Sequence, residues 1–153
     1  MVNEFSRTEL LLGVEGIATL KNAKVMVFGV GGVGSHCIDA LARCGVGNLV
    51  LIDNDTVSMT NINRQSIAYH STIGRYKTEV MKQRIADICP ETKVVTYERF
   101  IGRDNLDDIL AEKPDYRGLL VTSLNYFLAE IKKQLQHLRE ENESLCGFIK
   151  EKY

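Results

Sequence analysis

Residues 29–35 read GVGGVGS and come directly after the apolar run KVMVF at residues 24–28. The glycines at positions 29, 31, 32 and 34 satisfy the G-x-G-x-x-G pattern, here between a predicted strand and a predicted helix. Such glycines permit a tight turn and let backbone N–H groups approach a phosphate, and the N-terminus of the following helix adds partial positive charge. The stretch therefore predicts that Gly29, Gly31, Gly32 and Gly34 bind the phosphates of a nucleotide.

Strands and helices alternate around this turn. Short runs rich in Val and Leu are typical of buried strands, whereas apolar residues spaced three and four apart predict amphipathic helices. The sequence predicts one or two short helices over 6–23, strands over 23–30, 48–55, 93–101 and 117–124, and helices over 33–46, 75–89 and 103–113. This order predicts an α/β, Rossmann-like fold with a truncated, doubly wound, mostly parallel sheet.

The last part of the sequence has a different pattern. From residue 124 onward, the spacing alternates between four and three residues, which is a heptad repeat. One of its two seam positions holds Leu128, Leu135, Asn142 and Ile149, and the other holds Leu124, Ile131, Leu138 and Leu145. Two interpretations stay open: a two-stranded coiled coil whose register the lone Asn fixes, or a long amphipathic helix packed on its own sheet. Both predict a nucleotide-binding domain over 1–122 and a helical tail over 123–153.

Composition excludes several classes of protein. The 153 residues carry a formal net charge of −1, which provides no overall basic field of the kind that DNA binding uses. No stretch approaches the roughly 18 consecutive apolar residues of a transmembrane helix, so we expect no membrane partner. The four cysteines are scattered without a Cys-x-x-Cys pair, which predicts no metal site made of cysteines and a reduced, cytoplasmic setting.

Polar residues after the second predicted strand indicate which nucleotide binds. Asp53 ends that strand, where a carboxylate can accept hydrogen bonds from ribose hydroxyls. The irregular segment that follows carries Asn61, Arg64 and Gln65, and Lys77 lies near the start of the next helix. A nicotinamide site needs a flat apolar slot, whereas attack on the α-phosphate of ATP develops negative charge that fixed cations stabilise. Arg64 and Lys77 therefore indicate ATP rather than a redox dinucleotide.

With these motifs, residues 5–116 resemble the adenylating domain of the ubiquitin-activating-enzyme superfamily. Within it, the run from FSRTELLLG at residue 5 to NINRQ at residue 65 is very similar to the bacterial tRNA threonylcarbamoyladenosine dehydratases. The resemblance implies ATP-dependent adenylation of the carboxylate of threonylcarbamoyladenosine in tRNA. The acyl-adenylate then closes to a cyclic, dehydrated product, with release of AMP and pyrophosphate. The resemblance also implies Mg²⁺ and a homodimer.

The same resemblance implies roles for single residues. The Gly29–Gly34 loop would hold the phosphates, Asp53 the ribose, and Asp55 would support the loop or the nucleotide. The implied phosphate contacts are Asn61, Arg64, Gln65 and Lys77. Arg7 matches the N-terminal arginine that in this superfamily reaches across a dimer to the partner's ATP. The catalytic residues expected from the resemblance are Arg64, Lys77 and, from a second copy, Arg7.

The sequence departs from the superfamily after KPDY at residues 113–116. No aspartate occurs after Asp115, so the aspartate that holds Mg²⁺ in the superfamily has no counterpart by position. Two explanations compete: a truncated, frameshifted or fused gene product, or replacement by a glutamate such as Glu130 or Glu140. We favour the first, because a coil-forming helix is a poor place for a metal ligand. We expect weak binding of ATP or its phosphates and impaired adenylation.

Three other functions compete with tRNA modification. Adenylation of the C-terminal glycine of a ubiquitin-like or sulfur-carrier protein would use the same nucleotide site. A non-catalytic nucleotide-binding module that dimerises through its C-terminal helix would account for the heptad repeat and the missing aspartate. An NAD-dependent oxidoreductase is the weakest candidate, because it leaves NINRQ and Lys77 unexplained.

Overall fold

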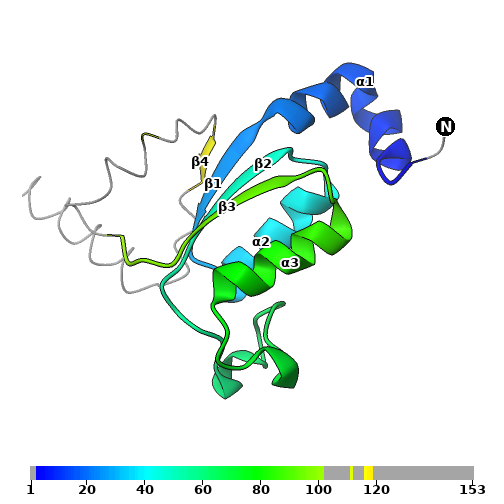
Figure 1. Ribbon diagram of the computed structural model, residues 1–153. Helices are drawn as coiled ribbons and strands as arrows, with labels where there is room; N and C mark the ends of the chain where they lie inside the picture. Colours follow the sequence, from blue (N-terminus) through cyan, green and yellow to red (C-terminus); the bar gives the residue numbers. More distant parts are fainter. Residues whose placement is uncertain (1–2, 102–110, 112–115, 119–153) are drawn as a thin grey trace, which may run out of the picture. The chain divides into compact units, whose positions relative to one another are not determined.

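The computed structural model describes residues 3–101, 111 and 116–118. Within them, a four-stranded sheet has the order β3-β2-β1-β4, and every pair of neighbouring strands is parallel (Figure 1). The strands are β1 (Lys24–Phe28), β2 (Asn48–Ile52), β3 (Lys93–Tyr97) and β4 (Tyr116–Gly118). The predicted Rossmann-like α/β class with a mostly parallel sheet is confirmed.

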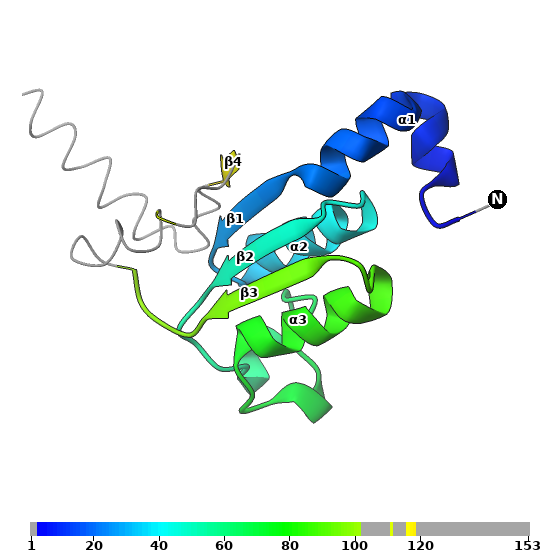
Figure 2. The same cartoon turned by 45° about the horizontal axis from the view of Figure 1, so that its top comes forward.

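Two helices cover one face of the sheet. α2 (Gly32–Arg43) follows β1 and α3 (Lys77–Ile88) precedes β3, and both lie on the same side in Figures 1 and 2. On this face, Val27 and Leu51 belong to the main core together with Ile38 and Ile85, all fully buried. Burying each such side chain contributes about 1.5–3 kcal/mol. This core therefore holds α2 and α3 against β1 and β2.

The other face of the sheet carries a smaller apolar cluster. Met26, Val50 and Ile52 are buried there, and Phe28 and Tyr97 pack against them. Neighbouring residues of a strand point to opposite faces, which is why β1 and β2 supply both clusters. Among the residues that the structure describes, helices cover only the first face.

α1 (Ser6–Asn22) precedes β1 and bends at Gly13, where φ is 72° and ψ is 172°. The predicted one or two short helices are thus two helical segments joined at a residue whose positive φ favours glycine. The end of α1 is fixed to the amino ends of the strands. There, Gly47 N–H donates to Leu20 O at 3.0 Å, and Asn48 N–H donates to Ala23 O at 3.1 Å.

The strands β1, β2 and β3 end earlier than predicted, at Phe28, Ile52 and Tyr97. α3 begins at Lys77 rather than at residue 75, because Tyr76 has a non-helical ψ of 134°. The predicted strand over 117–124 overlaps β4. The rest of that strand, the predicted helix over 103–113 apart from residue 111, the predicted domain boundary after residue 122 and the heptad repeat lie outside the described residues.

Candidate functional site

The glycine turn leaves the sheet at the carboxyl end of β1. Gly29 has a φ of 90°, and its N–H donates to Ile52 O at 2.7 Å. A side chain would be strained at this φ, so the position requires glycine. Gly31 is extended and Gly32 begins α2. The unpaired N–H groups of the first turn of α2 therefore lie at the carboxyl edge, where parallel sheets of this class bind ligands.

The carboxylate of Asp53, the residue after β2, holds two loops together. Its Oδ2 accepts a hydrogen bond from Val30 N–H at 2.6 Å, and its Oδ1 accepts one from Asp55 N–H at 2.8 Å. The Asp53 side chain is only 8% exposed. Hydrogen bonds to an ionised carboxylate are stronger than neutral ones. Asp53, predicted to bind a ribose, is thus also the residue that fixes the shape of the glycine turn.

Lys77 brings a buried ammonium group to the same edge. Its Nζ lies 2.6 Å from Asp55 Oδ2 and 4.0 Å from Asp53 Oδ1, and its backbone N–H donates to Asp55 O at 3.1 Å. The Lys77 side chain is 6% exposed, whereas the Asp55 side chain is 61% exposed. Asp55 therefore holds Lys77 in place from the solvent side, while Asp53 links the pair to the glycine turn.

Two 3-10 turns, η1 (Met59–Asn61) and η2 (His70–Thr72), order the irregular segment between β2 and α3. Asn61 is buried, and its Oδ1 accepts a hydrogen bond from Ser58 N–H at 2.9 Å. This bond closes a capping box around η1. The side-chain oxygen of Asn61 therefore accepts a hydrogen bond within the loop. The side-chain NH₂ group of Asn61 is left as the part that can contact a ligand.

Arg64 lies across the glycine turn. A Cβ built on Gly32 would be 3.5 Å from Arg64 Cγ and 3.6 Å from both its Cδ and its backbone O. The Arg64 guanidinium is held within its own loop, because Nη1 donates to Thr60 O and to Asn63 Oδ1, at 2.9 Å each. The side chain remains exposed. A cation is thus placed beside the turn that the sequence predicts to bind phosphates.

Gln65 is buried, and its Oε1 has no hydrogen-bond partner among the described residues. Phosphate oxygens only accept hydrogen bonds, so Gln65 can contact a phosphate only through its amide nitrogen. Its unpaired oxygen suits a hydroxyl group or a water molecule instead. The predicted phosphate contact is therefore limited to one end of this side chain.

The structure brings most predicted site residues to one edge of the sheet, but not Arg7. Near Arg7, the ring of Phe5 lies only 2.9 Å from a Cβ built on Gly45, in the turn between α2 and the amino end of β2. Arg7 is exposed there, at the opposite end of the strands from the glycine turn. A contact between Arg7 and a nucleotide would have to come from a second copy, and this stays a prediction.

Two residues of α2 contact the Arg64 loop without having been predicted as site residues. Ser35 Oγ accepts a hydrogen bond from Ser66 N–H at 3.0 Å, and His36 Nε2 donates to Arg64 O at 3.3 Å. Ser35 comes directly after the last glycine of the motif, and this position is the only feature of the sequence that could have indicated a role at the site. The pairing spans 31 positions along the chain, so no local pattern reveals it.

Charged side chains join α2 to α3. Asp39 Oδ1 accepts a hydrogen bond from Arg84 Nε at 2.5 Å, and its Oδ2 accepts one from Arg43 Nε at 2.9 Å. Burial raises the pKa of Asp39, but the hydrogen bonds and charges of Arg43 and Arg84 outweigh it and hold that pKa below its usual value. The hydrogen bond to Asp39 likewise raises the pKa of Arg84. The helix that follows the glycine turn is thereby tied to the helix that begins at Lys77.

The described residues offer no metal site of their own. They contain no group of three or more His, Cys, Asp or Glu side chains placed to hold a metal ion. Mg²⁺ prefers carboxylate and water oxygens. Here the Asp53 oxygens accept backbone N–H groups, and Asp55 is paired with Lys77. These two carboxylates therefore do not fit a Mg²⁺ ion, and we assign no chemical step to one.

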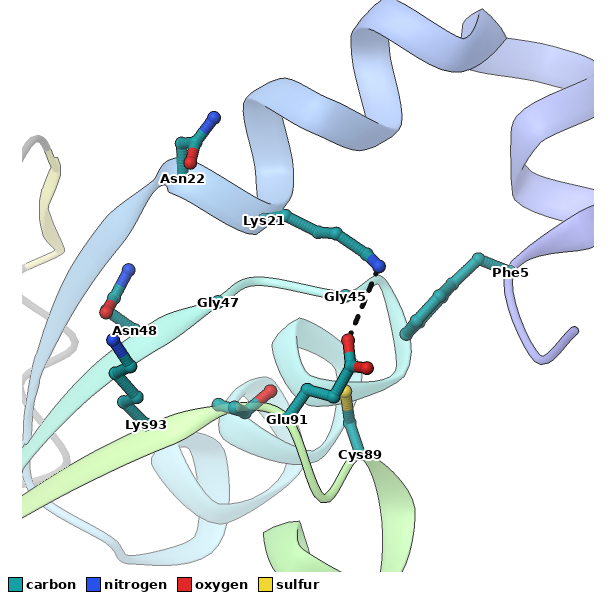
Figure 3. Close-up of a pocket in the computed structure, with 10 residues that line it drawn as sticks. Phe5, Lys21, Asn22, Gly45, Gly47, Asn48, Cys89, Glu91 and Lys93 are labelled. Carbon is teal, nitrogen blue, oxygen red and sulfur yellow. Dashed lines mark hydrogen bonds and ion pairs between the residues drawn. The ribbon is translucent and has the colours of Figure 1, made fainter.

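A cavity of about 200 Å³ lies elsewhere, at the amino ends of the strands (Figure 3). Lys21 and Glu91 line it and form an ion pair, with Lys21 Nζ 3.4 Å from Glu91 Oε2. The other lining residues shown in Figure 3 include Phe5, Gly45 and Lys93. No predicted site residue lines this cavity, so it is separate from the candidate nucleotide site.

Comparison with known proteins places the chain in a family. The model of the ThiF family matches residues 5–117. The chain belongs to the ThiF family. It is 48% identical over 116 residues to a tRNA threonylcarbamoyladenosine dehydratase of Bacillus subtilis, covering 76% of this chain and 46% of that protein. The predicted resemblance to such dehydratases is confirmed.

Other members of the family are also similar. The chain is 39% identical over 100 residues to the adenylyltransferase and sulfurtransferase UBA4 of Candida glabrata, covering 65% of this chain and 23% of that protein. The crystal structure of the Escherichia coli dehydratase TcdA in complex with ATP matches with a TM-score of 0.77 at 37% identity, covering 79% of this chain and 50% of that one. The chain thus spans half the length of these ThiF relatives or less. No described helix is long and apolar enough to cross a membrane.

Proposed function

We propose that this ThiF-family chain binds ATP at the Gly29–Gly34 turn and transfers its adenylyl group to a carboxylate. The observation that carries the proposal is the convergence of the glycine turn, Arg64 and Lys77 at one edge of the sheet. A triphosphate needs both backbone N–H donors and fixed cations. The similar Escherichia coli dehydratase was solved in complex with ATP, which supports this choice of nucleotide.

Each part of the site has a role in this proposal. The N–H groups of the glycine turn and of the first turn of α2 bind phosphate oxygens. Asp53 accepts a hydrogen bond from a ribose hydroxyl while it holds the glycine turn in shape. A carboxylate oxygen of the substrate attacks the α-phosphorus, the bond from that phosphorus to the bridging oxygen breaks, and pyrophosphate leaves. Arg64 and Lys77 stabilise the negative charge that develops on the α-phosphate and on the leaving pyrophosphate. Asn61 and Gln65 donate hydrogen bonds from their side-chain NH₂ groups to phosphate oxygens.

For the substrate, we propose the carboxylate of threonylcarbamoyladenosine in tRNA. The acyl-adenylate that forms then closes to the cyclic, dehydrated product and releases AMP. Support comes from the dehydratases of Bacillus subtilis and Escherichia coli, which are 48% and 42% identical to this chain over the matched residues. We expect slower turnover than by those dehydratases, because the aspartate that holds Mg²⁺ in the superfamily has no counterpart by position after KPDY at residues 113–116.

We also propose that the chain acts as a homodimer in which Arg7 reaches the partner's ATP. α1 leaves Leu10 and Leu11 each 86% exposed, and Val14 is 70% exposed. Exposed apolar residues gathered on one short segment are typical of an interaction surface. Arg7 lies on the same helix, so covering this surface with a second copy would bring it close to the other chain.

A second candidate substrate is the C-terminal carboxylate of a ubiquitin-like or sulfur-carrier protein. The specific observation that favours it is the 39% identity with UBA4 of Candida glabrata. Adenylation of such a protein needs the same nucleotide site. The difference is that a protein, rather than tRNA, carries the carboxylate.

Isotope exchange between pyrophosphate and ATP tests the proposal. We expect exchange in the presence of tRNA that carries threonylcarbamoyladenosine, and none with tRNA that lacks the modification. Exchange stimulated only by a carrier protein would support the second candidate. ATP binding without exchange under either condition would instead indicate a non-catalytic nucleotide-binding module and would contradict the proposed reaction.

A further inference from the structure

The first turn of α2 contacts the Arg64 loop at several points. Ser35 Oγ accepts the N–H of Ser66 at 3.0 Å, and His36 Nε2 donates to Arg64 O at 3.3 Å. Gly32 lies beside Arg64, and a Cβ added to it would be in ordinary van der Waals contact with Arg64 Cγ, at 3.5 Å. One helical turn therefore carries both the N–H groups at the predicted phosphate site and the groups that hold the backbone around Arg64.

Arg64 depends on such contacts for its position. Among the described residues, its Nη1 bonds only to Thr60 O and Asn63 Oδ1, which belong to the same loop. No side-chain hydrogen bond or ion pair joins the guanidinium to the sheet or to α3 in the described part of the chain. The place of this cation relative to the glycine turn is therefore set by where the loop backbone is held.

The acceptor in the hydrogen bond between Ser35 and Ser66 is buried, although the bond as a whole is only part-buried. Ser35 is 0% exposed, and its own N–H is used in the helix, where it donates to Gly31 O at 2.9 Å. Its hydroxyl oxygen, a separate group, accepts the hydrogen bond from the Ser66 N–H. Water cannot easily replace a buried acceptor, so loss of the hydroxyl would leave that N–H unpaired. His36 is exposed and adds a second, weaker connection.

We propose that Ser35 and His36 are positioning residues that hold Arg64 at the phosphate site. They act through the loop backbone and touch neither nucleotide nor substrate. The inference rests on the proposed function, because it concerns the binding of ATP at the glycine turn. It predicts that removing these contacts weakens the binding of the phosphates but leaves the binding of the nucleoside unchanged.

The test compares ATP with adenosine on the full chain. Titration calorimetry measures the affinity for ATP, and competition against ATP measures the affinity for adenosine. We expect Ser35→Ala to weaken ATP binding by about threefold to tenfold, the effect of one lost hydrogen bond. His36→Ala should weaken it by about twofold to threefold, since its bond is longer and exposed to water. Adenosine should bind both variants as it binds the unaltered chain.

Ser66→Ala provides the matched control. The Ser66 hydroxyl has no partner among the described residues, and alanine keeps the backbone N–H that bonds to Ser35, so ATP affinity should not change. Thermal unfolding of each variant sets a temperature at which it is folded. If Ser35→Ala is not folded, the exposed His36→Ala variant decides the question.

Failure of the inference and failure of the proposed function look different. If the unaltered chain does not bind ATP, the proposed function is wrong, and the positioning role is wrong with it. If the unaltered chain binds ATP and both variants bind it equally well, only the positioning role is wrong. A purely structural role for Ser35 would lower the unfolding temperature while keeping the ratio of ATP to adenosine affinity, and that result would also overturn the inference.

Discussion

Asp53 Oδ2 accepts a hydrogen bond from the backbone N–H of Val30 at 2.6 Å, so the acid that follows β2 fixes the turn that follows β1. The two residues meet because the strands are parallel and in register, with Phe28 paired to Ile52. The chain therefore leaves both strands at the same level. A single carboxylate shapes the predicted phosphate site and lies 4.0 Å from the buried ammonium of Lys77.

Replacing Asp53 by asparagine should loosen the glycine turn. An amide offers one acceptor oxygen where the carboxylate offers two, so the N–H of Val30 or of Asp55 loses its partner. We expect the free energy of unfolding to fall by about 1–3 kcal/mol, the cost of an unpaired buried donor. Urea unfolding measures this change, and calorimetry should show weaker ATP binding.

Asn54→Ala is the matched control for this variant, because Asn54 is the exposed neighbour of Asp53. It should change neither stability nor ATP affinity. If Asp53→Asn binds ATP as tightly as the unaltered chain, the carboxylate does not organise the site.

Lys77→Met should weaken ATP binding while sparing adenosine. Methionine keeps most of the side-chain volume and removes the ammonium group that lies 2.6 Å from Asp55 Oδ2. A charge-assisted contact to phosphate corresponds to about tenfold to a hundredfold in affinity. Calorimetric titration with both ligands measures the two affinities.

Lys82→Met controls for the loss of a positive charge on the same helix, since Lys82 is exposed. Its ATP affinity should equal that of the unaltered chain. Equal weakening by both substitutions would show that the effect comes from net charge and not from the position of Lys77.

Asp39→Asn should destabilise the chain in a pH-dependent way. The pKa of Asp39 is lowered in the folded protein. Its contribution to the free energy of unfolding is therefore complete above its pKa in the unfolded chain, about 3.9, and is lost as the pH falls through its pKa in the folded protein. At pH 7 we expect a difference of about 1 kcal/mol in unfolding free energy. Urea unfolding from pH 7 down to about pH 3 should show this difference shrinking. A difference that stays constant over this range would contradict the ion pair with Arg84.

Gly47→Ala should disrupt the junction between α1 and the sheet. A Cβ at this position would lie 1.8 Å from Lys21 O and 2.7 Å from Lys21 C, which are backbone atoms that cannot rotate away. We expect a loss of roughly 3 kcal/mol or more, because the close approach of the two backbones must open.

Gly13→Ala is the comparison, since nothing lies within 4 Å of its added Cβ and only its φ of 72° is unfavourable. With a ψ of 172°, this residue lies in a backbone region that is essentially restricted to glycine, and a loss of about 1–3 kcal/mol is expected there. Thermal unfolding ranks the two variants, and similar losses would argue against the contact between Gly47 and Lys21.

Local patterns in the sequence predicted the parts of the fold that local chemistry decides. The glycine turn after β1 follows from residue types alone, since Gly29 needs a positive φ. The end of β2 at an acid and the helix after the irregular segment were predicted to within a few residues. The end of β2 was predicted too late, because Asp53 is a polar loop residue whose carboxylate bonds to the glycine turn across the sheet edge.

Contacts between distant segments could not be predicted in the same way. Nothing near Ser35 in the sequence indicates its bond to Ser66, and nothing near Lys77 indicates that Asp55 rather than a ligand holds its ammonium group. These pairings depend on how the loop between β2 and α3 folds back over the glycine turn. The conformation of that loop is fixed by capping hydrogen bonds such as the one from Ser58 N–H to Asn61 Oδ1. The sequence of this segment has no periodicity from which such bonds could be predicted.

The claim that this site binds ATP is tested most directly by two calorimetric titrations of the same preparation, one with ATP and Mg²⁺ and one with NAD. We expect saturable binding of ATP that Lys77→Met weakens, and no saturable binding of NAD. Saturable binding of NAD together with no binding of ATP would contradict the claim.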